Sequence, residues 1–174
     1  MKRNLGLIRE KLEIKILILF ILRRLPDPVT FEELTELAIC DDGISYFDYC
    51  ECVAELVKTE HLRLKHNKYS ITEKGIRNGG ITEGSLPYSV RLHAENIASA
   101  YRSAQARSAK ITTSRTAKED GSYKVASSLS DGMGEILSLE MLAANEKQAR
   151  ALENGFRRNA EGVYNALIGI ILES

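Results

Sequence analysis

The chain of 174 residues contains no Trp, and aromatic residues make up only 6% of it. This scarcity argues against a platform of stacked aromatic side chains for single-stranded nucleic acid. The formal net charge is zero, which excludes a polycationic protein that binds nucleic acid by bulk charge alone. The length suffices for one domain or two small ones with a buried core. The proportions of hydrophobic (44%) and charged (28%) residues are typical of a globular protein.

Long apolar runs are also missing. The longest covers residues 16–22, whereas a membrane span needs roughly 20 apolar residues. Arg23 and Arg24 follow this run where a signal peptide would carry small residues for cleavage. The sequence therefore predicts a cytoplasmic protein that does not interact with a membrane, and it predicts a buried helix over the run.

The three cysteines, Cys40, Cys50 and Cys52, form no C-x-x-C motif. We expect free thiols in a reducing cytoplasm and no disulfide. A zinc site built from these cysteines and His61 would match no common ligand spacing. We therefore expect no metal and no cofactor.

Catalytic motifs are lacking as well. The sequence contains no phosphate-binding loop, no nucleophile elbow and no H-E-x-x-H helix. Gly132-Met133-Gly134 lacks the third glycine of a dinucleotide loop and lies in a predicted turn. The three histidines are scattered, so we expect a protein that is not an enzyme.

Two helices are predicted before residue 40. The first covers residues 7–24, amphipathic at first and then buried on all sides, and it ends before Pro26 and Pro28. The second covers residues 31–39 and begins with a capping box formed by Thr30 and Glu33.

A third helix and a hairpin follow. Asp48 and Glu51 have the spacing of a second capping pair, which predicts a helix from there to about residue 59. Residues 62–65 and 68–71 alternate in hydrophobicity around the turn at 66–67, which predicts a two-stranded hairpin. Three helices and a hairpin in this order are typical of a winged helix-turn-helix domain, here over residues 1–80.

The remaining chain changes its periodicity twice. After a short helix that starts at Thr72 and ends at Gly79-Gly80, a linker over 79–84 leads to a helix that ends near Ser108. From Ala109 a period of two predicts three antiparallel strands, with Leu137, Leu139 and Met141 on one face of the third. A last helix is capped by Asn145 and Gln148. The expected fold class is α+β, with a linker or dimerisation helix over 81–108 and a β-β-β-α domain over 109–174.

Two stripes predict a homodimer. Residues in the linker helix recur at alternating steps of four and three, as in a coiled coil. Glycines recur every seven residues along the last helix, beside a buried stripe expected at Leu152, Phe156, Val163 and Ile170. These glycines allow close approach either of the chain's own sheet or of a helix from a second copy. The residues assigned to a dimer seam are Val90, Ala94, Ile97, Tyr101, Gly155, Gly162 and Gly169.

Four stretches in the same order resemble a known family. They are residues 46–57, 69–75 (Y-S-I-T-E-K-G), 86–91 (L-P-Y-S-V-R), and 145–149 leading to Asn159-Ala160-Glu161 and Tyr164. The chain thereby resembles an uncharacterised domain-of-unknown-function family of Gram-positive bacteria (Firmicutes) with a winged helix of the PadR and MarR type. The resemblance implies a transcription factor and supplies neither a ligand nor catalytic residues.

The charges are unevenly distributed. Residues 1–26 carry a net charge of +5, residues 27–60 a net charge of −9, and residues 61–80 a net charge of +4. The predicted hairpin and N-terminus are therefore basic, whereas the third helix is acidic and a poor match to a duplex. A carboxylate can still accept a hydrogen bond from cytosine N4.

We expect a homodimeric regulator that binds double-stranded DNA. The contacts assigned to the third helix are Ser45, Tyr46, Asp48, Tyr49, Glu51, Cys52, Glu55 and Lys58. The contacts assigned to the hairpin and the N-terminus are Arg63, Lys65, His66, Lys68, Lys2 and Arg3. The alternative is a winged-helix module that binds no DNA and docks a basic protein partner on its acidic helix-turn-helix face.

Overall fold

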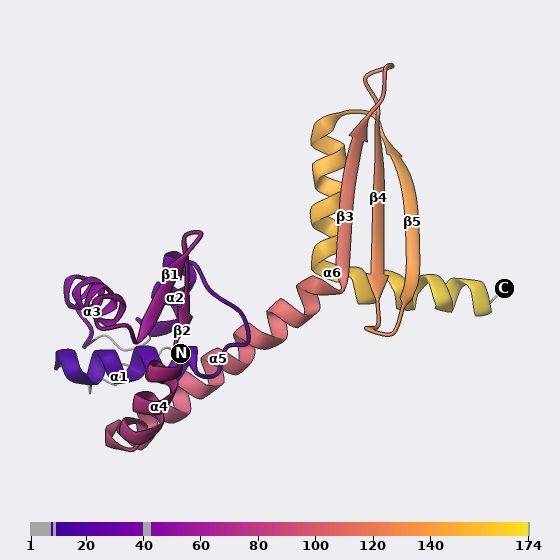
Figure 1. Cartoon of the computed structure of the whole chain (residues 1–174). Coiled ribbons are helices and arrows are strands. Elements are labelled where there is room, and N and C mark those ends of the chain that lie inside the picture. Colours follow the sequence, from indigo (N-terminus) through magenta and orange to yellow (C-terminus); the bar gives the residue numbers. More distant parts are fainter. Residues whose placement is uncertain (1–7, 9, 40–42, 174) are drawn as a thin grey trace. The chain divides into compact units, whose positions relative to one another are not determined.

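The computed structural model describes residue 8 and residues 10–39 and 43–173. The chain separates into two compact units, Met1–Arg102 and Ser103–Ser174. Helices predominate in the first unit, and a three-stranded antiparallel sheet with a C-terminal helix forms the second (Figure 1). This order confirms the predicted α+β class. No described helix is both long enough and apolar enough to cross a membrane.

Helix α1 (Lys11–Leu22) forms the centre of the first unit. Ile14 and every residue from Ile16 to Leu22 are buried, so the apolar run is surrounded by protein on all sides. The helix begins four residues later than predicted, and Ile8 is buried outside it. Other elements of the unit pack around this part of α1, because from Ile16 to Leu22 the helix has no polar side chain.

The next two helices show one confirmed and one wrong capping prediction. Helix α2 (Phe31–Ala38) begins with the predicted box: Thr30 Oγ1 accepts from the Glu33 amide at 3.2 Å, and the Thr30 amide donates to Glu33 Oε2 at 2.8 Å. Helix α3 (Tyr46–Lys58) has Ser45 at its N-cap, not Asp48. Asp48 instead lies in the first helical turn, where a carboxylate is also favourable because of the helix dipole.

Strands β1 (Leu62–Lys65) and β2 (Lys68–Ile71) form the predicted hairpin in antiparallel register. His66 and Asn67 both have positive φ angles, 50° and 60°, as a tight two-residue hairpin turn requires. Val29 bridges to Tyr69 at the other edge of β2. The β1–β2 hairpin is therefore fixed to the segment that joins α1 and α2.

Helix α4 (Glu73–Thr82) continues past Gly79-Gly80, where an end was predicted, and leads into the single turn η1 (Glu83–Ser85). The reason is packing. A Cβ atom on Gly79 would lie 2.9 Å from Arg23 Cδ and 3.2 Å from Leu19 Cβ. The glycine allows α4 to approach α1 closely, and it does not terminate the helix.

Helix α5 (Tyr88–Ala109) is long, and its residues up to Arg102 belong to the first unit. Val90, Ala94 and Ala98 are buried, and Ile97 and Tyr101 pack against the core of that unit. Ala109, expected to begin a strand face, is the last residue of this helix.

The second unit contains strands β3 (Ile111–Ala117), β4 (Tyr123–Ser130) and β5 (Glu135–Ala143), hydrogen-bonded in the order β3-β4-β5. Helix α6 (Glu146–Leu172) covers one face of the sheet and starts at the predicted cap, where Asn145 Oδ1 accepts from the Gln148 amide at 2.9 Å. The side chains beneath it form two small apolar clusters, one around Phe156 and one around Val125.

Helix α6 is kinked at Asn159, whose φ and ψ of −141° and 38° are not helical. Arg107 holds the kink by donating to the carbonyl oxygens of Arg157 and Arg158, both at 3.1 Å, and by pairing with Glu161. These carbonyls lie just before the kink, where regular helical hydrogen bonding is interrupted. Ile170, expected in the buried stripe after the kink, is 66% exposed.

Candidate nucleic-acid interface

Helix α3 is held by one apolar face. Tyr49, Cys52, Val53 and Leu56 are buried, at the i, i+3, i+4, i+7 spacing that places side chains on one side of a helix. The Tyr49 ring packs 5.7 Å from the ring of Phe31, measured between centroids. Burial raises the pKa of Tyr49, so the phenol stays neutral.

Two predicted contacts therefore face the wrong way for DNA. Tyr49 and Cys52 are both 0% exposed, and Cys52 Sγ lies 3.4 Å from the Lys11 carbonyl oxygen. Burial also raises the pKa of the Cys52 thiol. Both side chains anchor α3 in the core, and neither can reach a base edge.

The carboxylates of α3 lie on the side next to α1, where two lysines meet them. Lys11 Nζ pairs closely with Glu51 and lies 3.7 Å from Asp48 Oδ1, while Lys15 pairs with Glu55. The Glu51 hydrogen bond raises the pKa of Lys11, and the bond from Lys15 lowers the pKa of Glu55. The acidic side chains of α3 are thus largely neutralised within the fold.

This arrangement was not predicted, although the sequence contains a signal for it. Lys11 and Lys15 are four residues apart, and so are Glu51 and Glu55. Each pair therefore lies along one side of its helix. Because the two lysines and the two glutamates have the same spacing, helices that pack together through these sides are predicted to form ion pairs between them.

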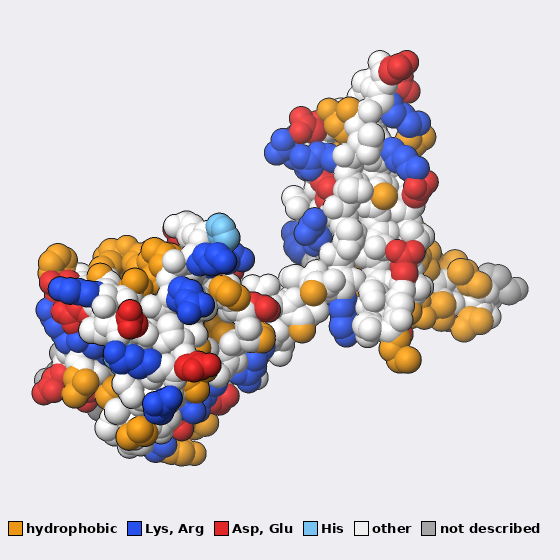
Figure 2. Space-filling model, viewed as in Figure 1, with side chains coloured by type: hydrophobic (Ala, Val, Ile, Leu, Met, Phe, Trp, Pro, Cys, Tyr) orange, Lys and Arg blue, Asp and Glu red, His pale blue; other side chains and the backbone are white. Residues whose placement is uncertain are grey.

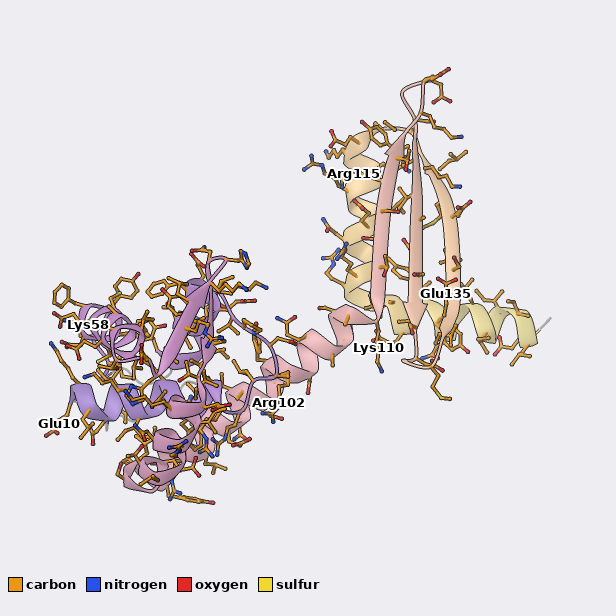
Figure 3. All side chains as sticks on the ribbon, in the orientation of Figure 1. Glu10, Lys58, Arg102, Lys110, Arg115 and Glu135 are labelled. Carbon is orange, nitrogen blue, oxygen red and sulfur yellow. The ribbon has the colours of Figure 1, made fainter. Side chains whose placement is uncertain are left out.

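The exposed side of α3 is aromatic and apolar at its start and basic at its end. Tyr46 and Phe47 are 59% and 70% exposed, Ala54 is exposed, and Lys58 stands at the last turn (Figure 3). Phe47 and Ala54 were not among the predicted contacts. Their position opposite the buried 49-52-53-56 face is the signal that could have identified them.

The β1–β2 hairpin gathers positive charge at its tip (Figure 2). Lys65 lies directly opposite Lys68, and Arg63 lies opposite Ser70. Like charges opposite each other on neighbouring strands are destabilising. Arg63, Lys65 and Lys68 form no ion pair with any carboxylate in the described part of the chain.

These basic side chains surround a hollow. It is lined by Pro28, Arg63, Lys65, His66, Lys68 and Ser70, without a carboxylate. A hollow with cationic walls and a hydroxyl group suits an anionic oxygen group, because the anion would relieve the repulsion between the lysines.

Of the other predicted residues, Lys2 and Arg3 lie outside the described residues, as does Cys40. His61 joins α3 to α4: its ring nitrogens lie 2.9 Å from Thr59 Oγ1 and 2.8 Å from Asn78 Nδ2. Burial lowers the pKa of His61. In the described part of the chain, no three His, Cys, Asp or Glu side chains are placed to hold a metal ion.

The residues of the expected dimer seam fall into two groups: those of α5 belong to the core of the first unit, and the glycines lie along α6. Val90 and Ala94 are buried in the core of the first unit, and Ile97 and Tyr101 pack against it. A Cβ atom added to Gly155 or Gly169 would meet no atom within 4 Å, whereas Gly162 accommodates the Asn159 side chain. The sheet of the same chain therefore does not lie against Gly155 or Gly169.

The comparisons with known proteins identify a family. The model of DUF4364, a domain of unknown function, matches residues 14–171. The chain belongs to this family. No significant match exists among curated proteins or among solved structures. The match extends over both units, so the sheet and α6 are as much a part of the family domain as α3 and the hairpin.

Proposed function

We propose that this DUF4364 protein is a cytoplasmic, homodimeric regulator of transcription that binds double-stranded DNA through a winged helix formed by residues 1–80. The observation that carries the proposal is the cationic hollow of the β1–β2 hairpin, which contains no carboxylate. In a winged helix this hairpin is the wing, and its basic residues contact phosphates.

Helix α3 is the helix that would enter the major groove. It precedes the hairpin directly and packs against β1. Its exposed Tyr46, Phe47 and Ala54 offer apolar contacts of the kind made with thymine methyl groups, and Ser45 offers a hydroxyl. Lys58 at the far end would meet a phosphate.

The ion pairs between α1 and α3 answer the main electrostatic objection. Unpaired carboxylates would repel a duplex. Because Glu51 and Glu55 are paired with Lys11 and Lys15, this side of α3 presents a far smaller negative field than the sequence alone indicates. The same pairing leaves less acidic surface for the alternative, a basic protein partner docked on this face.

A salt titration with hairpin variants tests the proposal. Full-length wild type and the Lys65→Ala/Lys68→Ala variant are titrated against a fluorescent random duplex at several salt concentrations. Each phosphate contact contributes about −0.9 to the slope of log affinity against log salt, so the variant should flatten the slope by up to about 2 units.

The matched control is Lys118→Ala/Lys147→Ala, which removes two exposed lysines from the second unit. It changes the net charge by the same amount and should leave the slope unchanged. Wild type that binds no duplex even at low salt would contradict the proposal. Equal effects of both double variants would show binding without the hairpin.

The variant Glu51→Gln/Glu55→Gln separates DNA binding from the alternative. It removes two carboxylates and releases Lys11 and Lys15, so affinity for random duplex should rise. A basic partner protein docked on this face would instead lose affinity. Loss of such a partner without any gain in DNA binding would favour the protein-docking module.

A further inference from the structure

Strand β5 forms an unpaired edge of the sheet in the second unit. Within the described residues it is hydrogen-bonded only to β4, so the backbone groups along its other side have no strand partner. The strand is long, spanning Glu135–Ala143, and is mostly apolar. Such an edge is a template for another strand.

The opposite edge is better protected. Strand β3 carries Arg115 and several threonines, and all residues from Ser114 to Ala117 are exposed and polar or small. An edge with few apolar side chains is less prone to unwanted pairing, whereas β5 exposes Ile136 and Leu142 alongside its two carboxylates. Of the two edges, β5 is the one suited to a partner.

Helix α6 runs past this edge after its kink. Val163 and Tyr164 of α6 pack against the same apolar cluster around Phe156 as Leu137 and Leu139 of β5, and the helix then continues beyond the strand (Figure 1). Glu135 marks the end of β5 near this crossing (Figure 3). The part of α6 past β5 therefore lies on the side of the sheet where a further strand would be added.

The overhanging part of α6 is apolar and uncovered. Residues 162–172 contain no charged side chain, and Ile168, Ile171 and Leu172 are 40%, 66% and 77% exposed. Hydrophobic side chains gather at this end of the chain (Figure 2). Glu161 and Glu173 flank the stretch, whereas a helix that lies on an anionic membrane carries lysines and arginines there.

We infer that a second copy of this chain pairs its β5 antiparallel with β5 across a two-fold axis, giving a six-stranded sheet, and that α6 of each copy covers the sheet of the other. The inference rests on the homodimer of the proposed function and names its interface. A two-fold axis perpendicular to the sheet keeps both helix-covered faces on the same side. The overhang of α6 then lies over the partner's strand.

The side chains of β5 are self-complementary in one register. With Leu139 on the axis, Ile136 lies opposite Leu142, Leu137 opposite Met141, and Ser138 opposite Glu140 of the second copy. With Glu140 on the axis, two carboxylates would face each other, which is unfavourable. With Ser138 on the axis, Ile136 would face Glu140. Of these three registers, the one centred on Leu139 pairs the apolar residues with one another and places Ser138 opposite Glu140, so that no two carboxylates face each other.

The size of the second unit supports the same conclusion. Its two clusters contain four and three buried apolar residues among those described. A unit of this size with so little buried surface is marginal alone and gains from association. A second copy would cover the half-buried Leu139 and Met141 as well as the α6 overhang.

The test is the dimer dissociation constant, measured by light scattering and sedimentation on the full-length protein without DNA. Ser138 is exposed and points away from α6, so changes there spare the fold. Ser138→Glu places a carboxylate opposite Glu140 twice and should weaken the dimer by about fivefold. Ser138→Lys should strengthen it by a similar factor.

Three further variants test the proposed register and the contribution of α6. Ser138→Glu/Glu140→Lys restores opposite charges across the axis, although it also breaks the ion pair of Glu140 with Lys124, and should return the dissociation constant to within about threefold of wild type. Ile171→Lys/Leu172→Lys removes the apolar overhang and should weaken the dimer by at least about tenfold. Ser114→Glu, the matched control on the exposed face of β3, should change nothing.

A monomer at all concentrations would overturn the inference, and so would a dimer insensitive to both Ser138 variants. A dimer weakened by Ser114→Glu alone would place the interface at β3 and overturn it too. A monomer that cosediments with phosphatidylcholine or phosphatidylglycerol vesicles would assign the overhang to a membrane. Because none of these measurements contains DNA, their failure leaves the DNA proposal to its own salt titration.

Discussion

The two units of this chain bury apolar surface in different ways. In the first, 22 of the described residues form one continuous core around α1. In the second, two clusters of four and three residues lie under α6. Two polar features separate these two clusters: Ser127, whose buried hydroxyl has no hydrogen-bond partner among the described residues, and the ion pair of Arg115 with Glu153.

The difference shows how each unit reaches stability. The run from Ile16 to Leu22, buried on all sides, gives the first unit one continuous core, because the neighbouring elements each contribute an apolar face to it. The second unit has one sheet face and one helix, with polar groups at the centre of their contact. It leaves apolar side chains uncovered at β5 and α6, which we assign to a second copy.

The largest expected effect concerns the core of the first unit. Leu17→Ala removes a fully buried side chain of α1 and should lower the free energy of unfolding of this unit by about 3 kcal/mol. Urea unfolding, followed by far-UV circular dichroism because the chain contains no Trp, measures this loss of stability. Leu12→Ala, at a side chain 63% exposed on the same helix, is the control and should cost almost nothing.

A second prediction concerns the ion pair inside the second unit. Arg115→Ala leaves Glu153 buried without its partner and should cost about 2 kcal/mol, reduced from a fully buried pair because a third of the Arg115 side chain is exposed. Arg150→Ala breaks an exposed pair on the same helix and should leave the urea midpoint unchanged. If both variants shifted the urea midpoint equally, the buried pair of Arg115 and Glu153 would matter no more to stability than an exposed pair.

The elements predicted correctly from the sequence are those that depend only on residues close together in the chain. The Thr30 capping box, the hairpin with its turn at 66–67 and the Asn145 cap each depend on neighbouring residues, so periodicity and capping suffice to find them. Gly79-Gly80 was predicted to end α4, because a glycine pair has the same sequence signal whether it ends a helix or meets another one. Only the packing of α4 on α1 distinguishes the two.

The candidate site was predictable for the hairpin and less so for α3. The basic residues of the hairpin are adjacent in sequence, so their gathering follows from the hairpin itself. The neutralisation of Glu51 and Glu55 depends on which side of α3 meets α1. Tyr49 and Cys52 were assigned to DNA, although their spacing from Val53 and Leu56 places all four side chains on the buried face of the helix.

A smaller effect is expected from the cap of α2. Thr30→Ala removes the hydroxyl that accepts from the Glu33 amide and should destabilise the first unit by about 1 kcal/mol. Thr30→Ser retains the acceptor and should stay close to wild type. Thermal unfolding compares the two variants, and an equal loss in both would show that the methyl group matters more than the cap.

The smallest expected effect is a pH dependence of the stability of the first unit. The pKa of His61 is lowered in the folded chain, chiefly by burial and secondarily by Lys74. The unfolded chain therefore binds the proton first, and stability should fall as the pH drops from 7 toward 5, through the ordinary histidine range. His61→Gln should flatten this dependence in urea unfolding, whereas His66→Gln, at an exposed turn residue, should preserve it.

The central claim is that DNA lies against the hairpin and the exposed side of α3. Ultraviolet crosslinking of the full-length protein to a random duplex, followed by peptide mapping, tests the location directly. The account predicts crosslinked peptides from residues 45–58 and 62–71. Crosslinks confined to residues 103–174, or none under conditions where the duplex is bound, would contradict it.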